Sequence, residues 1–320
     1  MSMKTTMLVA STLMAALAAP MPSFAQDKPT LKVIVGFPPG GSADLLTRLL
    51  ANGLQNDYTV VVENRPGAAG RIALNAAKNA KPDGQTVLVV PAGPMVVFPH
   101  AYKQLDYDPV KDFAPISLIA RTQFGIVAGP ASGATTIAEM IAKIKADPLS
   151  GTYGTPGSGT MQHFLGGMFS QAAGVPMEHV GFQGGSPANV ALLGGHINYK
   201  FDVVSESAEL HRTGKVRILA VAGDERDPVV PDVPTLREQG VDMSASVWFG
   251  MYAPAATPPD VRQRLEDAVV AALHQPELRE RIAKQGYEPV GSSSAELAQV
   301  QQADLKRWEA PIKASGVALD

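Results

Sequence analysis

The chain of 320 residues contains no cysteine. It therefore has no disulfide, no thiol nucleophile, no thiolate metal ligand and no N-terminal cysteine for lipid attachment. Aromatic residues make up only 6%, so surfaces that stack sugars or bases are few. The formal net charge of −3 is modest and no basic stripe is present, which argues against a nucleic-acid partner. After the N-terminus no apolar run is long enough to cross a membrane.

The first 25 residues have the pattern of a secretory signal peptide. Lys4 precedes a long apolar stretch, and Ser23-Phe24-Ala25 forms a small-x-small cleavage site. Pro20 interrupts the apolar stretch before it could span a bilayer, which argues against a membrane anchor. We therefore predict export and cleavage after Ala25. Since 320 minus 25 leaves 295 residues, the mature chain is long enough to fold without disulfides.

Segments typical of strands and of helices alternate after Gln26, which predicts an α/β fold with largely parallel sheets. Two extended apolar segments, 116–128 and 247–253, are expected to cross between two lobes. Two crossings place a cleft between the lobes, and such clefts are favoured ligand sites. The strands of the lobes are expected at 33–35, 58–63 and 86–90, near Tyr153, Val180 and Phe201, and at 218–221.

The predicted division follows from these crossings. Lobe 1 comprises residues 26–122 plus 251–320, and lobe 2 comprises residues 123–250. The last helix, 295–313, is expected to be interrupted at Pro311 because proline lacks the N–H group that a helix interior needs.

A glycine-rich turn that leads into a helix occurs three times. Such a turn exposes backbone N–H groups at the positive end of the helix dipole, where an anion is stabilised. In the first copy, Phe37-Pro38-Pro39-Gly40-Gly41 ends an apolar strand. Ser42 is predicted to be the N-cap of the helix that follows, with Ala43 and Asp44 in its first turn.

The second copy lies within residues 152–173. Its loop contains Gly157 and Gly159, and its helix is expected to begin near Thr160. Ser158 or Thr160 is the predicted N-cap, and His163 lies one turn into the helix.

The third copy lies within residues 180–195. Gly184 and Gly185 follow a strand, Ser186 is the predicted N-cap, and Pro187 suits the first helical position. Gly194 is expected to close this short helix. One glycine-rich loop is ordinary turn chemistry, but three copies across two lobes predict a receptor for a small anion.

Sequence signatures of catalysis are missing. The chain has no phosphate-binding G-x-x-x-x-G-K-[ST] loop, no complete dinucleotide-binding pattern and no G-x-S-x-G nucleophile elbow. Its six histidines show no H-x-x-x-H spacing, so neither a metal nor a cofactor is expected. Ser42, Asp44 and His163 could form a hydrolytic triad across the cleft, although helix caps and first-turn acids are the commoner explanation. An exported hydrolase is therefore kept as an alternative.

Seven segments, in this order along the chain, resemble the solute receptors of tripartite tricarboxylate transporters, the periplasmic Bug-type binding proteins. The resemblance implies a type II periplasmic binding protein fold, with two α/β lobes joined by two crossing strands and a ligand cleft between them. It also implies a monomer in the periplasm that traps a carboxylate-bearing solute and passes it to membrane permease subunits. The segments are FPPGGSADLLTRLLA, VVVENRPGAAGRIALNAAKNAKPDGQT, DYDPVKDFAPISLIA, YGTPGSGTMQHFLGGMF, GGSPANVALLGGHI, PDVPTLREQG and WFGMYAPAATPPDV.

The candidate ligand-binding residues come from the three loops and the return crossing. No arginine lies in the loops, so we expect backbone N–H groups, with the hydroxyls of Ser42, Ser158 and Thr160, to hold the anion. Aromatic side chains at 37, 182 and 248 are expected to form an apolar wall. The full set is Phe37, Pro38, Gly40, Gly41, Ser42, Ala43, Asp44, Ser158, Gly159, Thr160, His163, Phe182, Gly184, Gly185, Ser186, Pro187, Asp202, Trp248 and Phe249.

Several roles stay open at this level. Asp44 either stabilises its own helix start or contacts an amino group of the ligand. Arg65 is expected to be a structural partner rather than a ligand contact. Two positions depart from the family pattern of acidic residues, and Asn198 is expected to affect packing while the effect of Ala191 is left open. The identity of the carboxylate is undetermined, and a sensor subunit that presents ligand to a membrane kinase is an alternative to transport.

Overall fold

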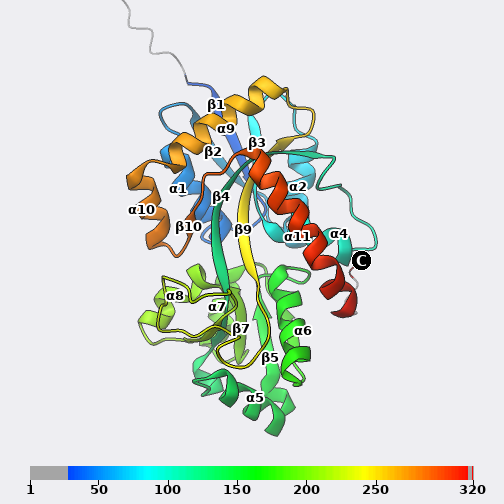
Figure 1. Ribbon diagram of the computed structural model, residues 1–320, viewed down its shortest axis with the longest axis vertical. Coiled ribbons are helices and arrows are strands. Elements are labelled where there is room, and N and C mark those ends of the chain that lie inside the picture. Colours follow the sequence, from blue (N-terminus) through cyan, green and yellow to red (C-terminus); the bar gives the residue numbers. More distant parts are fainter. Residues whose placement is uncertain (1–27, 316–318, 320) are drawn as a thin grey trace, which may run out of the picture.

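Two long strands join two α/β lobes, which lie one above the other in Figure 1. The computed structural model describes residues 28–315 and 319, so the predicted signal peptide lies outside the described residues. The joining strands are β4 (Phe113–Ala128) and β9 (Ser246–Pro254), which pair antiparallel. The two predicted crossing segments are thereby confirmed as neighbouring strands.

The upper lobe contains three mutually parallel strands in the order β2-β1-β3, followed by β9 and β4. The central residues of β1 and β3 are apolar and buried because helices cover both faces of a parallel sheet, whereas β2 lies at the edge and its Val61 is 47% exposed. The strands are β1 (Thr30–Val35), β2 (Thr59–Asn64) and β3 (Thr86–Pro91), with the short β10 (Glu288–Pro289) beside β4. The helices are α1 (Ser42–Gly53), α2 (Arg71–Lys78), α3 (Ala92–Val96), α4 (Phe98–Ala101), α9 (Pro259–Leu273), α10 (Pro276–Lys284) and α11 (Ser294–Ser315).

The lower lobe repeats this plan with β5 parallel to both β6 and β7. Its strands are β5 (Thr152–Thr155), β6 (Glu178–Gly181), β7 (Tyr199–Val203) and β8 (Arg217–Val221). Its helices are α5 (Ile137–Ala146), α6 (Met161–Ala173), α7 (Gly185–Leu193) and α8 (Val204–Arg212).

Strand β4 belongs to both lobes. Up to Gln123 it pairs with β9, and from Phe124 it pairs with β7, with β8 on its other side. The chain therefore passes between lobes within one continuous strand. The lobe boundaries at 122/123 and 250/251 stay a prediction.

Connections from parallel strands to helices open toward the region between the lobes. In the upper lobe β1 leads into α1, and in the lower lobe β5, β6 and β7 lead into α6, α7 and α8. Ligands of α/β proteins bind at the carboxyl ends of parallel strands. The fold thus turns the strand ends of both lobes toward one cleft.

Helices α1 and α7 begin differently from the prediction. Gly41 and Gly184 are the N-caps, so Ser42 is the first residue of α1 and Ser186 the second residue of α7. Pro187 is consequently the third helical residue instead of the first. Neither helix has a capping side chain of its own, because both N-caps are glycines, and a carboxylate from elsewhere lies at both starts, as described below.

The end of α11 also differs, because the helix continues through Pro311. Trp308 and Ile312 on either side of the proline are buried. Burying a large apolar side chain is worth about 1.5–3 kcal/mol, which offsets the hydrogen bond that proline removes.

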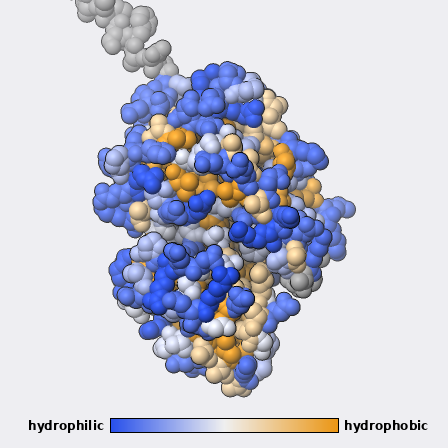
Figure 2. Space-filling view, viewed as in Figure 1, coloured by the Kyte–Doolittle hydropathy of each residue, from blue (hydrophilic) through white to orange (hydrophobic). Residues whose placement is uncertain are grey.

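The face in Figure 2 is predominantly hydrophilic, with apolar residues gathered over the middle of the upper lobe and along the lower lobe. Within residues 28–315 and 319, no helix combines the length and the apolar character that a membrane crossing requires.

Candidate ligand-binding site

A cavity with about 690 Å³ of atom-free space, which includes space open to solvent, lies between the lobes, and we name it the Glu206 cavity after its charged residue. Upper-lobe residues that follow β1 and β3 form one side, and lower-lobe residues that follow β5, β6 and β7 form the other. Eleven predicted site residues line it: Phe37, Pro38, Gly41, Ser42, Ala43, Thr160, Gly184, Gly185, Ser186, Pro187 and Phe249.

A second cavity, with about 740 Å³ of atom-free space that includes space open to solvent, adjoins the first and is named the Tyr102 cavity. The predicted residues Ser158 and Phe182 line it. Its wall includes Ala68 and Ala69, whose φ angles of 47° and 53° lie in the left-handed region. Such a conformation costs an alanine about 1–3 kcal/mol and is found most often at functional sites.

Trp248 lies away from both cavities. It is 2% exposed, and its Nε1 donates a hydrogen bond of 2.8 Å to Asp304 Oδ2. Side chains alternate between the faces of a strand, so Val247 and Phe249 reach the Glu206 cavity while Trp248 faces α11. The apolar wall expected from Trp248 is therefore formed by its two neighbours.

Asp44 is enclosed within its own lobe. Its carboxylate accepts hydrogen bonds from the Gly40 N–H, the Asn64 amide and the Arg48 guanidinium, all at 2.9–3.0 Å. Burial alone would raise the pKa of Asp44, but these hydrogen bonds outweigh it and lower the pKa. Of the two roles considered, the structure shows the one in which Asp44 stabilises its own helix start, with Gly40 as part of the same turn.

His163 fixes the loop before α6. Its Nδ1 accepts a hydrogen bond of 3.1 Å from the Gly159 N–H, and its ring stacks on His179 at 3.8 Å. An Nδ1 that accepts a hydrogen bond carries no proton, so the His163 ring is neutral. Burial lowers the pKa of both rings, to about 3 for His179, whose Nε2 lies 2.7 Å from Thr155 Oγ1. The backbone N-cap of α6 is Thr160, and its hydroxyl donates to the Gly157 carbonyl instead of capping the helix.

The hydrolytic triad is not assembled among these contacts. The Asp44 carboxylate accepts hydrogen bonds from its own lobe and the His163 Nδ1 accepts one from Gly159, so these two groups are not paired with each other as a triad requires. Within the part of the chain that the structure describes, no cluster of three or more histidine or acidic side chains is placed to hold a metal ion.

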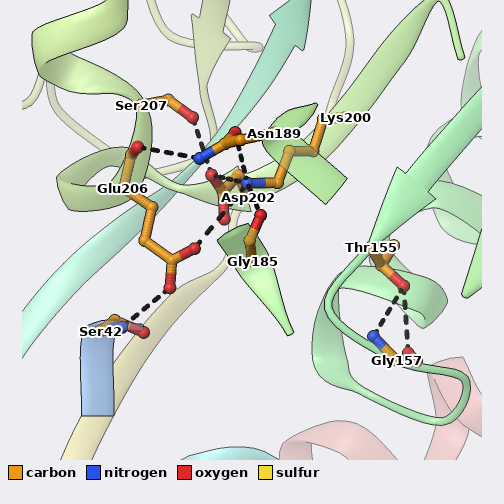
Figure 3. Close-up of polar contacts among 9 residues, drawn as sticks. All are labelled: Ser42, Thr155, Gly157, Gly185, Asn189, Lys200, Asp202, Glu206 and Ser207. Atoms are coloured by element: carbon orange, nitrogen blue, oxygen red, sulfur yellow. Dashed lines mark hydrogen bonds and ion pairs between the residues drawn. The ribbon is translucent and has the colours of Figure 1, made fainter. Parts of the chain in front are cut away.

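Glu206 lies at the meeting point of three helix starts (Figure 3). It is in the first turn of its own helix α8, and its Oε1 accepts a hydrogen bond of 2.9 Å from the Ser42 N–H at the start of α1. The start of α7 is so close that a Cβ on Gly185 would overlap Oε2. Helix starts carry partial positive charge, so this carboxylate is stabilised from both lobes.

Lys200 is a fully buried cation behind Glu206. Its Nζ lies 2.6 Å from Asp202 Oδ2, 2.8 Å from Asn189 Oδ1 and 3.8 Å from Glu206 Oε2. Burial raises the pKa of Asp202 to about 6, Lys200 opposes the rise, and Glu206 adds to it. With all three groups ionised, one positive and two negative charges give the cluster a net charge of −1. Asp202 thus supports the site from behind the cavity lining.

The sequence pattern missed several residues of the site. Glu206 and Lys200 were not predicted, nor were Met161 and Gln162 at the start of α6, which line the cavity. One signal was available, because charges at 200 and 202 alternate within an otherwise apolar buried strand and so share one face. A buried strand with two charges on one face indicates a buried ion pair.

Three further residues have structural contacts. Arg65 Nε donates a hydrogen bond of 2.6 Å to Glu63, as expected for a structural partner. Asn198 Nδ2 donates to the Ser150 carbonyl at 2.9 Å, in agreement with a packing role. Ala191 is 7% exposed and packs in the small core of the lower lobe.

Residues 46–317 match the family model described as the tripartite tricarboxylate transporter family receptor. The chain belongs to this receptor family. It is 30% identical to protein BugT of Bordetella pertussis over 309 residues, which cover 95% of this chain and 95% of BugT. The resemblance inferred from the sequence motifs is confirmed.

Solved structures of similar receptors share the fold. Rpa4515 of R. palustris with adipate is 29% identical, with a TM-score of 0.87 over 90% of this receptor and 98% of that chain. MatC of Rhodopseudomonas palustris with bound malate is 30% identical, with a TM-score of 0.83 over 88% of this receptor and 98% of that chain. The predicted periplasmic binding protein fold is therefore confirmed.

Proposed function

We propose that this receptor captures a small organic carboxylate between its lobes and delivers it to the permease subunits of a tripartite tricarboxylate-type uptake system. The observation that carries the proposal is the Glu206 cavity, where the starts of α1, α6 and α7 meet. Bound adipate in Rpa4515 and bound malate in MatC support a carboxylate ligand.

Main-chain amides would hold the carboxylate. Intrahelical bonding in α6 begins at His163, whose N–H donates to the Thr160 carbonyl at 3.0 Å. The N–H groups of Met161 and Gln162 therefore lie outside the ladder of their own helix, at its positive end. Phe37 and Phe249 offer apolar contacts to the rest of the ligand. Two groups of the considered triad, Asp44 and His163, are held by contacts within their own loops and helices, so the site is expected to bind without chemical turnover.

The remaining expectations form part of the same proposal. The receptor is exported with cleavage after Ala25, acts in the periplasm as a monomer, and closes by bending β4 and β9 where they pass between the lobes. Loss of uptake of the bound acid in a strain that lacks the receptor would support delivery to a permease.

Calorimetric titration of the purified receptor with adipate, malate, succinate and L-aspartate tests carboxylate capture. A ligand at a hundredfold excess over its Kd should also add about 2.7 kcal/mol to the free energy of unfolding. Failure of every carboxylate to bind would contradict the proposal.

A matched pair of variants tests the amides of α6. Met161→Pro and Met161→Ala both remove the methionine side chain, but only proline removes the N–H. Proline is favoured at the first helical position, and Thr160, with φ −71° and ψ 163°, suits the residue before it. Losing one charge-assisted hydrogen bond should weaken binding about tenfold in Met161→Pro relative to Met161→Ala. Equal affinities of the two variants would exclude the amide at Met161 as a ligand contact.

A further inference from the structure

Glu206 is the only charged residue among the described residues that line the Glu206 cavity. No lysine or arginine lines it to balance a ligand that brings only carboxylates. The cluster of Lys200, Asp202 and Glu206 already carries one excess negative charge. A purely anionic ligand therefore meets a like charge in the cavity wall.

We propose that Glu206 selects carboxylates that also carry an ammonium group, so that the ligand of this receptor is a zwitterionic amino acid. This inference rests on the proposed function and names its substrate class. The ammonium group binds the Glu206 carboxylate, while the ligand carboxylate lies at the start of α6.

Glu206 has acceptor capacity left for such a ligand. A carboxylate offers about four acceptor positions. The described contacts use one hydrogen bond, from the Ser42 N–H, and one longer approach of 3.8 Å to Lys200 Nζ. The side chain is 13% exposed, so an added ion pair would be largely shielded from water.

Two parts of the cavity lining have opposite character. The starts of α1 and α7 are already neutralised by Glu206, whereas among the described lining residues no second carboxylate accompanies Met161 and Gln162 at the start of α6. One part thus offers a negative charge and the other offers amides with partial positive charge. A zwitterion matches both parts, and a plain dicarboxylate matches only one.

A purely structural role for Glu206 predicts different results. As a first-turn acid it stabilises α8, and its hydrogen bond to Ser42 links the lobes. A group with only that role would affect folding and closure of the cleft. It would not give different affinities for two ligands that differ only in an ammonium group.

The test compares ligand pairs that differ only in the amino group, by calorimetric titration of the purified receptor. The pairs are L-2-aminoadipate with adipate, L-aspartate with succinate, L-phenylalanine with 3-phenylpropanoate, and L-leucine with 4-methylpentanoate. We expect the amino member of the best-bound pair to bind about 10- to 100-fold more tightly in the unaltered receptor. Glu206→Gln should reduce that preference at least tenfold.

Glu209→Gln is the control variant, because it removes a carboxylate from the exposed face of the same helix, where Glu209 is 72% exposed. It should keep the preference of the unaltered receptor, and thermal unfolding shows whether each variant is folded. Equal or tighter binding of the deaminated members, or an unchanged preference in Glu206→Gln, would overturn the inference and leave carboxylate capture standing. If no member of any pair binds and malate also fails, the proposed function itself is contradicted.

Discussion

Removing the charge of Lys200 tests whether the buried cluster behaves as an ion pair. Lys200 and Asp202 are both fully buried, and their 2.6 Å contact is reinforced by Asn189 Oδ1 at 2.8 Å. Lys200→Met keeps a long unbranched side chain but leaves the carboxylates of Asp202 and Glu206 without a cation. Removing one partner of a buried pair costs about 3–5 kcal/mol, because an uncompensated charge is left in the interior. We expect a loss of this size in the free energy of unfolding at pH 8.

The loss should depend on pH in a defined direction. The folded-state pKa of Asp202, about 6, lies above the ordinary value of 3.8, so the folded state binds the proton more tightly and stability falls as pH rises between those values. Lys200 lowers the pKa of Asp202, so removing Lys200 raises this pKa further. The pH range over which stability falls then extends to higher pH. At low pH the Asp202 carboxylate of the variant is protonated, so the destabilisation caused by its unpaired charge is removed. Each unit by which the pKa rises makes the deficit about 1.4 kcal/mol smaller at pH 5 than at pH 8.

The assay is urea denaturation of both proteins at pH 5 and pH 8, with Lys200→Met/Asp202→Asn as the matched control. The double variant removes both charges and keeps a polar group near Ser207, which donates a hydrogen bond to Asp202 Oδ2 at 2.7 Å. It should recover at least half of the loss at pH 8, since neutral replacements of buried pairs are often tolerated. A deficit below about 1 kcal/mol, or the same deficit at both pH values, would refute the reasoning.

Three further predictions concern the same region. Ser42→Pro removes the N–H group that donates a hydrogen bond to Glu206, at a helical position that proline suits. Compared with Ser42→Ala, it should lower the free energy of unfolding by about 1.5–3 kcal/mol. Equal stability of the two variants in urea would show that this hydrogen bond does not stabilise the protein. Gly185→Ala should lower the free energy of unfolding by about 1–3 kcal/mol because the new Cβ overlaps Glu206, and by much less when Glu206 is also replaced by alanine. Additive losses in this double-mutant cycle would argue against a contact between the two positions. The pKa of His163 and of His179 is lowered by burial, so the unfolded chain takes up protons first and stability is lost as pH falls below about 6.5. His179→Gln should therefore lose about 1–2 kcal/mol less than the unaltered receptor between pH 7 and pH 5 in denaturation measurements, and parallel pH profiles would count against a buried neutral pair.

Much of the fold could be predicted because its strands are buried apolar runs. Strand β3 was expected at 86–90 and spans Thr86–Pro91, and the two crossing segments coincide with β4 and β9. Such runs bury both faces in a parallel or central position, so composition alone marks them. Helix α8 gave no such signal, because β7 passes directly into it at Val203–Val204 without glycine or proline.

The sequence predicted the glycine-rich loops of the site but not its charged residues, Glu206 and Lys200. Glycine-rich loops mark where a chain turns into a helix, so Gly41, Gly184 and their neighbours were found from sequence. The capping assignments for Ser42 and Ser186 were wrong because they assumed a local partner. The partner of Ser42 is 164 positions away in the chain, and nothing in local sequence reports a contact of that range.

One carboxylate links the two lobes and underlies the expected selectivity. Glu206 belongs to the lower lobe, yet it accepts the hydrogen bond of an upper-lobe helix start, so it favours contact between the lobes. The same negative charge raises the free energy of any ligand that brings carboxylates alone. We therefore expect closure of the cleft and discrimination against plain acids to be coupled through this single group. An uncharged glutamine at this position should widen the range of acids that bind while weakening the contact between lobes. A variant that changed only one of these two properties would show that they have separate causes.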